Sequence, residues 1–165
     1  ICYLSKLKMI KNNNYIHGSG FVASHFKKKI SQIISNDVVI YAAGISNSQI
    51  NNKYSLKKEI KKIKYFLKNN IKRLIYISTY SVKDPSRKNS KYCKNKIKIE
   101  KLIKKNSKNY IIFRFPEIIG KSINSHTITN YFFQKIKNNI YFNVYYNAKR
   151  NFLDIDDAVK IAMYL

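Results

Sequence analysis

The chain has 165 residues and a formal net charge of +25, because 33 basic residues outnumber 8 acidic ones. This length corresponds to one ordinary domain, and an apolar fraction of 45% excludes a disordered polyelectrolyte. No apolar run reaches the length of a transmembrane helix, no signal-peptide pattern is present, and Cys2 and Cys93 give neither a disulfide framework nor metal-ligand spacing. We therefore expect a globular cytoplasmic domain without membrane insertion.

Strand-like and helix-like segments alternate along the chain, which is typical of a parallel α/β sheet. Apolar and β-branched runs predict strands at Tyr15–Ile16, Asp37–Gly44, Arg73–Ser78 and Tyr110–Phe115, with Tyr141–Tyr146 also extended. Helical spacing of apolar residues predicts helices at Phe21–Ile34, Ser55–Asn69, Lys91–Lys105, Ile128–Lys137 and Asp156–Leu165. The sheet is expected to have about four main strands, with helices on its faces.

A glycine-rich turn follows the first predicted strand. The run HGSGFVA, residues 17–23, has the G-x-G-x-x-A spacing of a dinucleotide-binding turn between a strand and a helix. In such a turn Gly18 permits the bend, Gly20 lets a pyrophosphate approach the backbone, and Ala23 allows close helix packing. The helix start adds N–H groups and a dipole that favour phosphate. The spacing by itself is equally compatible with a structural turn.

Tyr92 and Lys96 stand four residues apart in the predicted helix 91–105 and therefore share one face. A cation near a phenol favours the phenolate, so we expect Lys96 to lower the pKa of Tyr92 towards the range useful for acid/base catalysis. Ile99 and Ile103 continue the same stripe, which places the pair on the side that faces the core. The alternative is a core tyrosine beside a snorkelling lysine.

Polar residues gather at two further places. The run ISTYSV, residues 77–82, ends a buried strand at the edge where open α/β sheets bind ligands, although a polar strand cap explains it equally well. Asp154, Asp156 and Asp157 precede or begin the last helix, and we interpret them as capping charge rather than metal ligands. The three histidines are scattered without ligand spacing, so no metal site is expected.

Together these motifs resemble the extended branch of the short-chain dehydrogenase/reductase superfamily, the NAD-dependent epimerases and dehydratases. The resemblance runs from Tyr15 to the end of the chain, with His17 where many members carry the first glycine. The small form is most similar to epimerase-like proteins encoded with polysaccharide biosynthesis genes. The segments that carry the resemblance are HGSGFVASHF, DVVIYAAG, YISTYSV, the Tyr92/Lys96 pair, IIFRFPEIIG and RNFLDIDDAVKIA.

The resemblance implies NAD or NADP as cofactor, a nucleotide-sugar substrate and a homodimer formed through helices 55–69 and 91–105. It assigns catalysis to Thr79, Tyr92 and Lys96. It assigns substrate binding to Thr79 and to Arg150, whose family counterpart contacts the diphosphate. The cofactor contacts that it implies are Gly18, Ser19, Gly20, Phe21, Val22, Ala42, Ala43, Gly44, Tyr92, Lys96, Pro116, Glu117 and Ile118.

The sequence departs from the family pattern after the glycine turn. Residues 21–37 leave room for one helix and a turn, so the family's second strand, its helix and its third strand look deleted. The family residue that contacts the adenosine ribose has no counterpart in this sequence. The sequence therefore does not indicate whether the cofactor is NAD or NADP. Strand Tyr15–Ile16 becomes an edge strand. At the ends, residues 1–8 are interpreted as upstream of the natural start, and the uncapped last helix as a truncated, incomplete substrate region.

We thus predict an α/β fold with a reduced Rossmann-like parallel sheet, as one NAD(P)-binding domain over residues 9–165. The predicted function is that of an NAD(P)-dependent epimerase, dehydratase or reductase acting on a nucleotide sugar in surface-polysaccharide biosynthesis. A non-catalytic nucleotide-binding or scaffold protein is the first alternative. A basic nucleic-acid-binding module is the second, but only 4 of the 33 basic residues are arginine, which is a poor composition for specific nucleic-acid reading.

Overall fold

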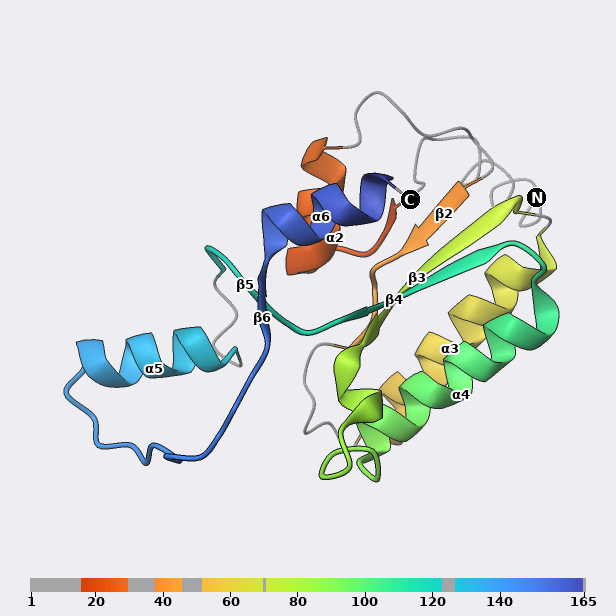
Figure 1. The fold of residues 1–165 in the computed structure, drawn as a ribbon. Helices are drawn as coiled ribbons and strands as arrows, with labels where there is room; N and C mark the ends of the chain where they lie inside the picture. The colour runs from red at the N-terminus through yellow and green to blue at the C-terminus, as the bar shows by residue number, and fades with distance from the viewer. Residues whose placement is uncertain (1–15, 30–37, 46–51, 70, 123–126, 165) are drawn as a thin grey trace.

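The computed structural model describes residues 16–29, 38–45, 52–69, 71–122 and 127–164 (Figure 1). Where they fall in these ranges, the predicted helices and the four main strands are confirmed with small shifts of their ends. Residues 1–15 and 30–34, which hold parts of the predicted first strand and first helix, lie outside the described residues. In chain order the elements are β1 (Ile16–His17), α2 (Phe21–Lys29), β2 (Val38–Tyr41), α3 (Lys53–Lys68), β3 (Arg73–Thr79), the 3₁₀ helix η1 (Tyr80–Lys83), α4 (Lys91–Asn106), β4 (Tyr110–Phe115), β5 (Glu117–Ile119), α5 (Ile128–Lys137), β6 (Phe152–Asp154) and α6 (Ile155–Tyr164).

The main sheet is parallel and has the order β1-β2-β3-β4. Ile16 pairs with Ile40, and Ile40 pairs with Ile75, so β1 bonds directly to β2. The structure therefore confirms the reduced Rossmann-like sheet. In the described chain no strand separates β1 from β2, and β1 lies at the edge of the sheet. Because all four strands run the same way, their carboxyl ends meet along one edge.

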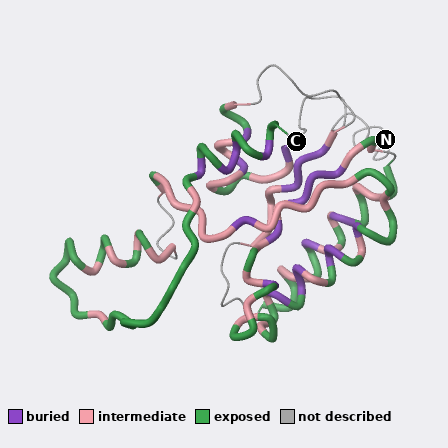
Figure 2. The backbone as a smooth tube through the Cα atoms, in the orientation of Figure 1, coloured by how far each residue is buried: buried purple, intermediate pink, exposed green. Residues whose placement is uncertain are grey.

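Helices cover both faces of the sheet, with α2 and α6 on one side and α3 and α4 on the other (Figure 1). Successive strand residues point to opposite faces. Ile40 and Ile75 accordingly join the core under α2 and α6, whereas Tyr41 and Tyr76 join the core under α3 and α4. This double cover explains why the strands read as continuous apolar runs. Figure 2 shows buried residues along the central strands and on the sheet-facing sides of the helices.

Several features lie outside the main sheet. The short strands β5 and β6 pair in parallel, with Glu117 opposite Phe152, and the sequence analysis missed both because three residues are too few to show a period. Helix α5 projects away from the sheet and has no buried residue (Figures 1 and 2). The segment Tyr141–Tyr146, which was predicted to be extended, forms no strand in the described chain, and both of its end tyrosines are 98% exposed. Among the described helices, none is long and apolar enough to cross a membrane.

Candidate active and cofactor site

The carboxyl edge of the sheet brings the predicted motifs together. The glycine turn follows β1, residues 42–44 follow β2, and Thr79 is the last residue of β3. The backbone N–H of Ala42 donates to the carbonyl oxygen of His17 at 2.9 Å, which continues the ladder between β1 and β2 up to the glycine turn. The structure therefore places the turn and the Ala-Ala-Gly segment side by side, as the sequence predicted.

The two glycines of the turn differ in their surroundings. Gly18 has φ +145°, and a Cβ atom there would lie 2.7 Å from the carbonyl oxygen of Ala42 and 2.9 Å from the Cβ of Ala23. A Cβ atom on Gly20 would meet nothing within 4 Å. Gly18 thus lets the turn pack against β2, while Gly20 borders open space at the start of α2. This arrangement fits a pyrophosphate held by the N–H groups of the first helical turn.

The remaining predicted cofactor residues divide between surface and core. Ser19 is exposed, and Pro116 links β4 to β5. The structure adds Gly120, with φ +147°, where a Cβ atom would lie 2.7 Å from Cγ2 of Ile155 and 3.0 Å from Cζ of Phe21. This glycine lets the end of β5 approach α2 and α6, and the sequence analysis missed it. The cofactor candidates that pack against the two cores are Phe21, Val22, Ala42 and Ile118 under α2 and α6, and Ala43 under α3 and α4.

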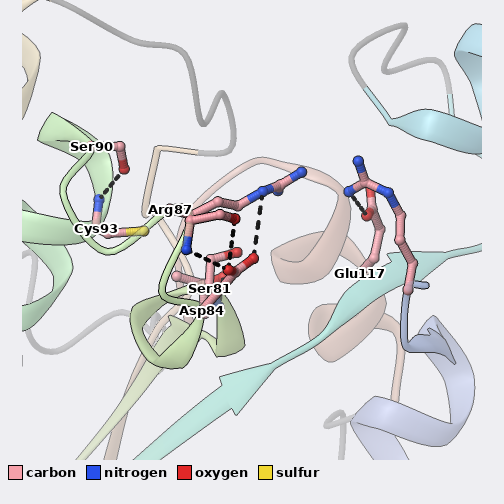
Figure 3. Close-up of polar contacts among 9 residues, drawn as sticks. Ser81, Asp84, Arg87, Ser90, Cys93 and Glu117 are labelled. Atoms are coloured by element: carbon pink, nitrogen blue, oxygen red, sulfur yellow. Dashed lines mark hydrogen bonds and ion pairs between the residues drawn. The ribbon is translucent and has the colours of Figure 1, made fainter. Parts of the chain in front are cut away.

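The three predicted catalytic residues lie together. The side chain of Ser90 caps α4 by accepting from the backbone N–H of Cys93 at 3.1 Å, which places Tyr92 in the first turn (Figure 3). Tyr92 forms a side-chain hydrogen bond with Thr79. The Nζ of Lys96 lies 5.8 Å from the centre of the Tyr92 ring. The stripe that was inferred from Ile99 and Ile103 is confirmed, because both isoleucines and Lys96 are buried.

Glu59, on α3, is a member of this cluster that the sequence analysis missed. Its Oε1 lies 2.9 Å from the Nζ of Lys96, and each of the two side chains is only 3% exposed. The same carboxylate accepts from the hydroxyl of Tyr76 at 3.1 Å and from the side-chain amide of Asn95 at 3.2 Å. A signal was present in the sequence, because Glu59 follows Leu56 by three residues and therefore belongs to the apolar stripe of its helix.

The electrostatics of Tyr92 differ from the sequence-based prediction. Burial, with a smaller contribution from the charge of Glu59, raises the pKa of Tyr92 to about 12, although the hydrogen bond with Thr79 acts in the opposite direction. The predicted lowering of this pKa is therefore wrong. That prediction considered the cation of Lys96 but not the burial of the phenol, and the structure also pairs the cation with a buried carboxylate. The phenol of Tyr92 consequently keeps its proton at neutral pH.

Gly44 connects this cluster to the cofactor edge. A Cβ atom on Gly44 would collide with the Nζ of Lys96 and would lie 3.2 Å from Oε1 of Glu59. The ion pair therefore sits directly against the backbone at the end of the Ala-Ala-Gly segment. A side chain at this position would displace the lysine head group, so the glycine serves the close approach of Lys96.

The loop between β3 and α4 is ordered by its own polar contacts. Oδ1 of Asp84 accepts from the backbone N–H of Ser86 at 2.9 Å and from its hydroxyl at 2.7 Å. These bonds hold the pKa of Asp84 below its ordinary value. The backbone N–H of Arg87 donates to the Asp84 carbonyl at 3.1 Å, and Figure 3 shows the Arg87 side chain extending over Asp84 towards the side on which Glu117 lies. The loop thus has a defined course between Thr79 and Tyr92.

Glu117 and Arg150 were predicted to contact the cofactor and the substrate separately, but the structure pairs them. The Nη1 of Arg150 lies 3.1 Å from Oε2 of Glu117. The backbone adds a second link, because the N–H of Glu117 donates to the carbonyl of Asn151 at 3.1 Å. Arg150 therefore lies beside β5, and its guanidinium is paired with the carboxylate of Glu117. A diphosphate at this position would have to replace the carboxylate of Glu117.

Two other candidate features lie apart from this cluster. The described residues contain no group of three or more histidine, cysteine, aspartate or glutamate side chains that is able to hold a metal ion. Oδ1 of Asp154 accepts from the backbone N–H of Asp156 at 2.7 Å, and this contact agrees with the capping interpretation of that segment. An open pocket of about 240 Å³ lies at the opposite, amino edge of the sheet, between the last turns of α3 and α4 and the loop residues that precede β3 and β4.

The fold and this edge define a Rossmann-like protein with a glycine turn and a clustered threonine, tyrosine and lysine. The sequence match agrees: residues 8–165 match the NAD dependent epimerase/dehydratase family, and the chain belongs to that family. Membership implies a nicotinamide dinucleotide, NAD or NADP, as cofactor.

Solved structures show the same fold. One is the capsular polysaccharide assembling protein CapF from Staphylococcus aureus, with a TM-score of 0.62 and 19% sequence identity. The match covers 90% of this chain and 46% of the CapF chain, so the chain spans less than half the length of that protein. At this identity the likeness shows the fold alone. Among curated proteins, no sequence matches the chain.

Proposed function

We propose that the protein is an NAD(P)-dependent enzyme that modifies a nucleotide sugar, as an epimerase, dehydratase or reductase of surface-polysaccharide biosynthesis. The observation that carries this proposal is the convergence of Thr79, Tyr92 and Lys96 beside Gly44, on the same sheet edge as the glycine turn. Family membership supports the cofactor class. The capsular polysaccharide role printed for CapF supports the choice of substrate class.

The residues at this edge fit a nicotinamide dinucleotide. The open space at Gly20 and the unpaired N–H groups of the first turn of α2 would hold its pyrophosphate. Lys27 adds positive charge to the turn, since its Nζ donates to the carbonyl of Gly18 at 2.7 Å. Lys96, against Gly44, would hold the ribose next to the nicotinamide. When bound, such a cofactor accepts or supplies a hydride.

The acid/base step belongs to Tyr92. The phenol holds its proton at neutral pH and can therefore act as the proton donor to a substrate oxygen, although a pKa of about 12 makes it a weaker acid than an ordinary tyrosine. Thr79, which is hydrogen-bonded to Tyr92, is placed to bond the same substrate oxygen and hold it in line. For Tyr92 to accept a proton instead, further positive charge has to come close to the phenol.

Arg150 is proposed to bind the diphosphate of the substrate. Its guanidinium has the planar donors that suit phosphate, and its present partner Glu117 is an acceptor of the same charge as a diphosphate oxygen. Binding would therefore exchange one anionic partner for another. The Glu117 side chain, once released, would lie beside Pro116 at the nicotinamide end of the edge.

The experiment that tests the proposal is a titration with NAD, NADH, NADP and NADPH, followed by nicotinamide fluorescence and by the melting temperature. We expect one redox pair to bind and to stabilise the protein by about 2.7 kcal/mol at a hundredfold excess over its Kd. The matched control is Gly20→Ala, in which a methyl group occupies the open space. Absence of binding by all four dinucleotides to the wild-type protein would overturn the proposal and favour a non-catalytic scaffold.

A further inference from the structure

We propose that Glu59 is a positioning residue of this site, which holds the ammonium of Lys96 against Gly44 and beside the ring of Tyr92. The inference rests on the proposed function, because Glu59 acts through Lys96 and Tyr92. It adds a fourth side chain, from a different helix, to the three that the sequence motifs supplied.

The bonding of Glu59 is what a positioning role requires. Its carboxylate receives three donors, from Lys96 at 2.9 Å, Tyr76 at 3.1 Å and Asn95 at 3.2 Å. These donors come from β3 and from α4, so the carboxylate is fixed from two directions. A lysine head group on a flexible stem has many positions available, and a fixed, buried counter-ion restricts it to one.

A purely structural contact between α3 and α4 does not need this ion pair. Elsewhere the same two helices contribute Ile63, Ile99 and Ile103 to one apolar core, and each of these side chains is fully buried. Removing two charges from water is unfavourable, and well-packed apolar residues often stabilise a protein as well or better. The pair also lies in the amino-terminal half of each helix, where Gly44 makes room for it. Its position therefore points to a role in the site.

The charge of Glu59 also acts on Tyr92. The titratable groups around the Tyr92 phenol are Glu59 from α3, Tyr76 from β3, and Cys93 and Lys96 from α4, and the charges of Glu59 and Cys93 raise its pKa. Glu59 is the carboxylate among them, and its charge opposes ionisation of the phenol. Its negative charge also balances the positive charge of Lys96. In this arrangement the site holds a proton on Tyr92 and a cation on Lys96 at the same time.

The test compares Glu59→Gln with Glu100→Gln in the cofactor-free protein. Glutamine keeps the shape of the side chain and one acceptor oxygen, but it removes the charge and replaces the second acceptor with an N–H donor. Glu100 is a matched control, because it is an equally buried carboxylate on α4, bonded at 2.6 Å to both Ser78 and Arg114 instead of to Lys96. Both substitutions are expected to lower stability, so stability alone does not distinguish a positioning role from a structural one.

Two readouts do make that distinction. The first is the rate at which an amine-reactive reagent labels Lys96, measured by peptide mass spectrometry with the exposed Lys94 and Lys98 as internal references. We expect this rate to rise about tenfold or more in Glu59→Gln and to stay unchanged in Glu100→Gln. The second is the titration of Tyr92, followed by NMR of ¹³Cζ-labelled tyrosine and assigned with Tyr92→Phe. Its midpoint should fall by about one pH unit in Glu59→Gln alone.

The proposal is overturned if Glu59→Gln leaves both readouts at their wild-type values, or if Glu100→Gln changes them equally. Should Glu59→Gln not fold, Glu59→Asp keeps the charge with a shorter reach, and it should expose Lys96 to labelling while the Tyr92 midpoint stays close to that of the wild type. Equal labelling of Lys96 in Glu59→Asp and the wild type would contradict the positioning role. Failure of the proposed function shows separately, as absence of dinucleotide binding to the wild-type protein.

Discussion

The ammonium of Lys96 lies 2.9 Å from the carboxylate of Glu59, and neither side chain is more than 3% exposed. This contact joins α4 to α3 beneath the end of β2. The sequence motif alone suggests that the cation of Lys96 is free. In the structure it belongs to a buried ion pair. The stability of the fold and the chemistry of the site therefore depend on the same two atoms.

A double-mutant cycle measures that dependence. Lys96→Met leaves the Glu59 carboxylate buried without its cation, and we expect a loss of about 3–5 kcal/mol in the free energy of unfolding. The double variant Glu59→Gln/Lys96→Met should be more stable than Lys96→Met alone, because it no longer buries an unpaired charge. Urea unfolding followed by circular dichroism gives the four values. Strictly additive losses would show that the two side chains do not interact in solution.

The two turn glycines form a second matched pair. Gly20→Ala should leave the melting temperature unchanged or slightly raised, because the new methyl group meets no atom within 4 Å. It should nevertheless weaken dinucleotide binding, since the methyl group takes the place proposed for a phosphate. Gly18→Ala should lower the melting temperature, because φ is +145° and the new Cβ would press on Ala42. Equal effects of both substitutions on stability would contradict this assignment.

Much of the fold was predictable from the sequence because its strands are covered on both faces. Continuous runs such as Arg73–Ser78 identify buried parallel strands without any alternation. The glycine turn and the short stretch before β2 then fix the reduced sheet, with β1 at its edge in the described chain. Strands β5 and β6 were not predictable, since three-residue strands form only when residues far apart in sequence meet.

The residues of the candidate site were predictable from the sequence only where a pattern within one helix or strand places them. Tyr92 and Lys96 share a helix face, and Thr79 ends a strand, so local periodicity brings them to the same edge. Glu59 comes from another helix, where its spacing from Leu56 places it on the apolar stripe but does not show which residue it contacts. Its contact with Lys96 follows from the way α3 docks on α4, which a sequence pattern does not encode. The pKa of Tyr92 was assigned the wrong direction because the burial of the phenol, which is the largest cause of the rise, and the charge of Glu59 were both left out of the argument.

Stability at alkaline pH should report on the buried tyrosines. Burial raises the pKa values of Tyr41, Tyr76 and Tyr92 above the ordinary value of 10. Between pH 10 and 12 the unfolded chain therefore loses these protons before the folded chain does, and the free energy of unfolding falls as the pH rises. Tyr92 alone contributes about 1–2 kcal/mol of this fall by pH 11.5, and Tyr92→Phe removes that part. Identical pH dependence of the wild type and Tyr92→Phe in urea titrations would refute the raised pKa.

A homodimer through α3 and α4 is proposed from the family resemblance, and it should respond to salt. The acidic residues of these two helices, Glu59 and Glu100, are both buried, so their exposed surfaces carry lysines without compensating acids. Like charges repel less as salt shortens the Debye length from about 10 Å at 0.1 M to about 3 Å at 1 M. Light scattering should therefore show more dimer at high salt, whereas nucleic-acid binding would weaken there. A dimer that dissociates on adding salt would argue against this interface.

The catalytic assignment depends on the hydroxyl of Tyr92. Tyr92→Phe keeps the ring in place and removes only the group that bonds Thr79, so the free energy of unfolding should change by no more than about 1 kcal/mol. Dinucleotide affinity should also stay near its wild-type value, because Lys96 and the glycine turn are untouched. Turnover on a nucleotide sugar identified from a panel should fall by about 10²–10⁴-fold, which is the usual contribution of a general acid or base.

Tyr80→Phe is the control for Tyr92→Phe, because Tyr80 follows Thr79 directly but is 51% exposed. It should keep wild-type turnover, which separates loss of a catalytic proton donor from a general disturbance of the loop after β3. Comparable losses in both variants would mean that packing around Thr79, and not the Tyr92 proton, limits the reaction. Wild-type turnover in Tyr92→Phe would show that the phenol does not transfer the proton. In that case Tyr92 and Lys96 would belong, with Glu59, to a structural cluster of the two helices.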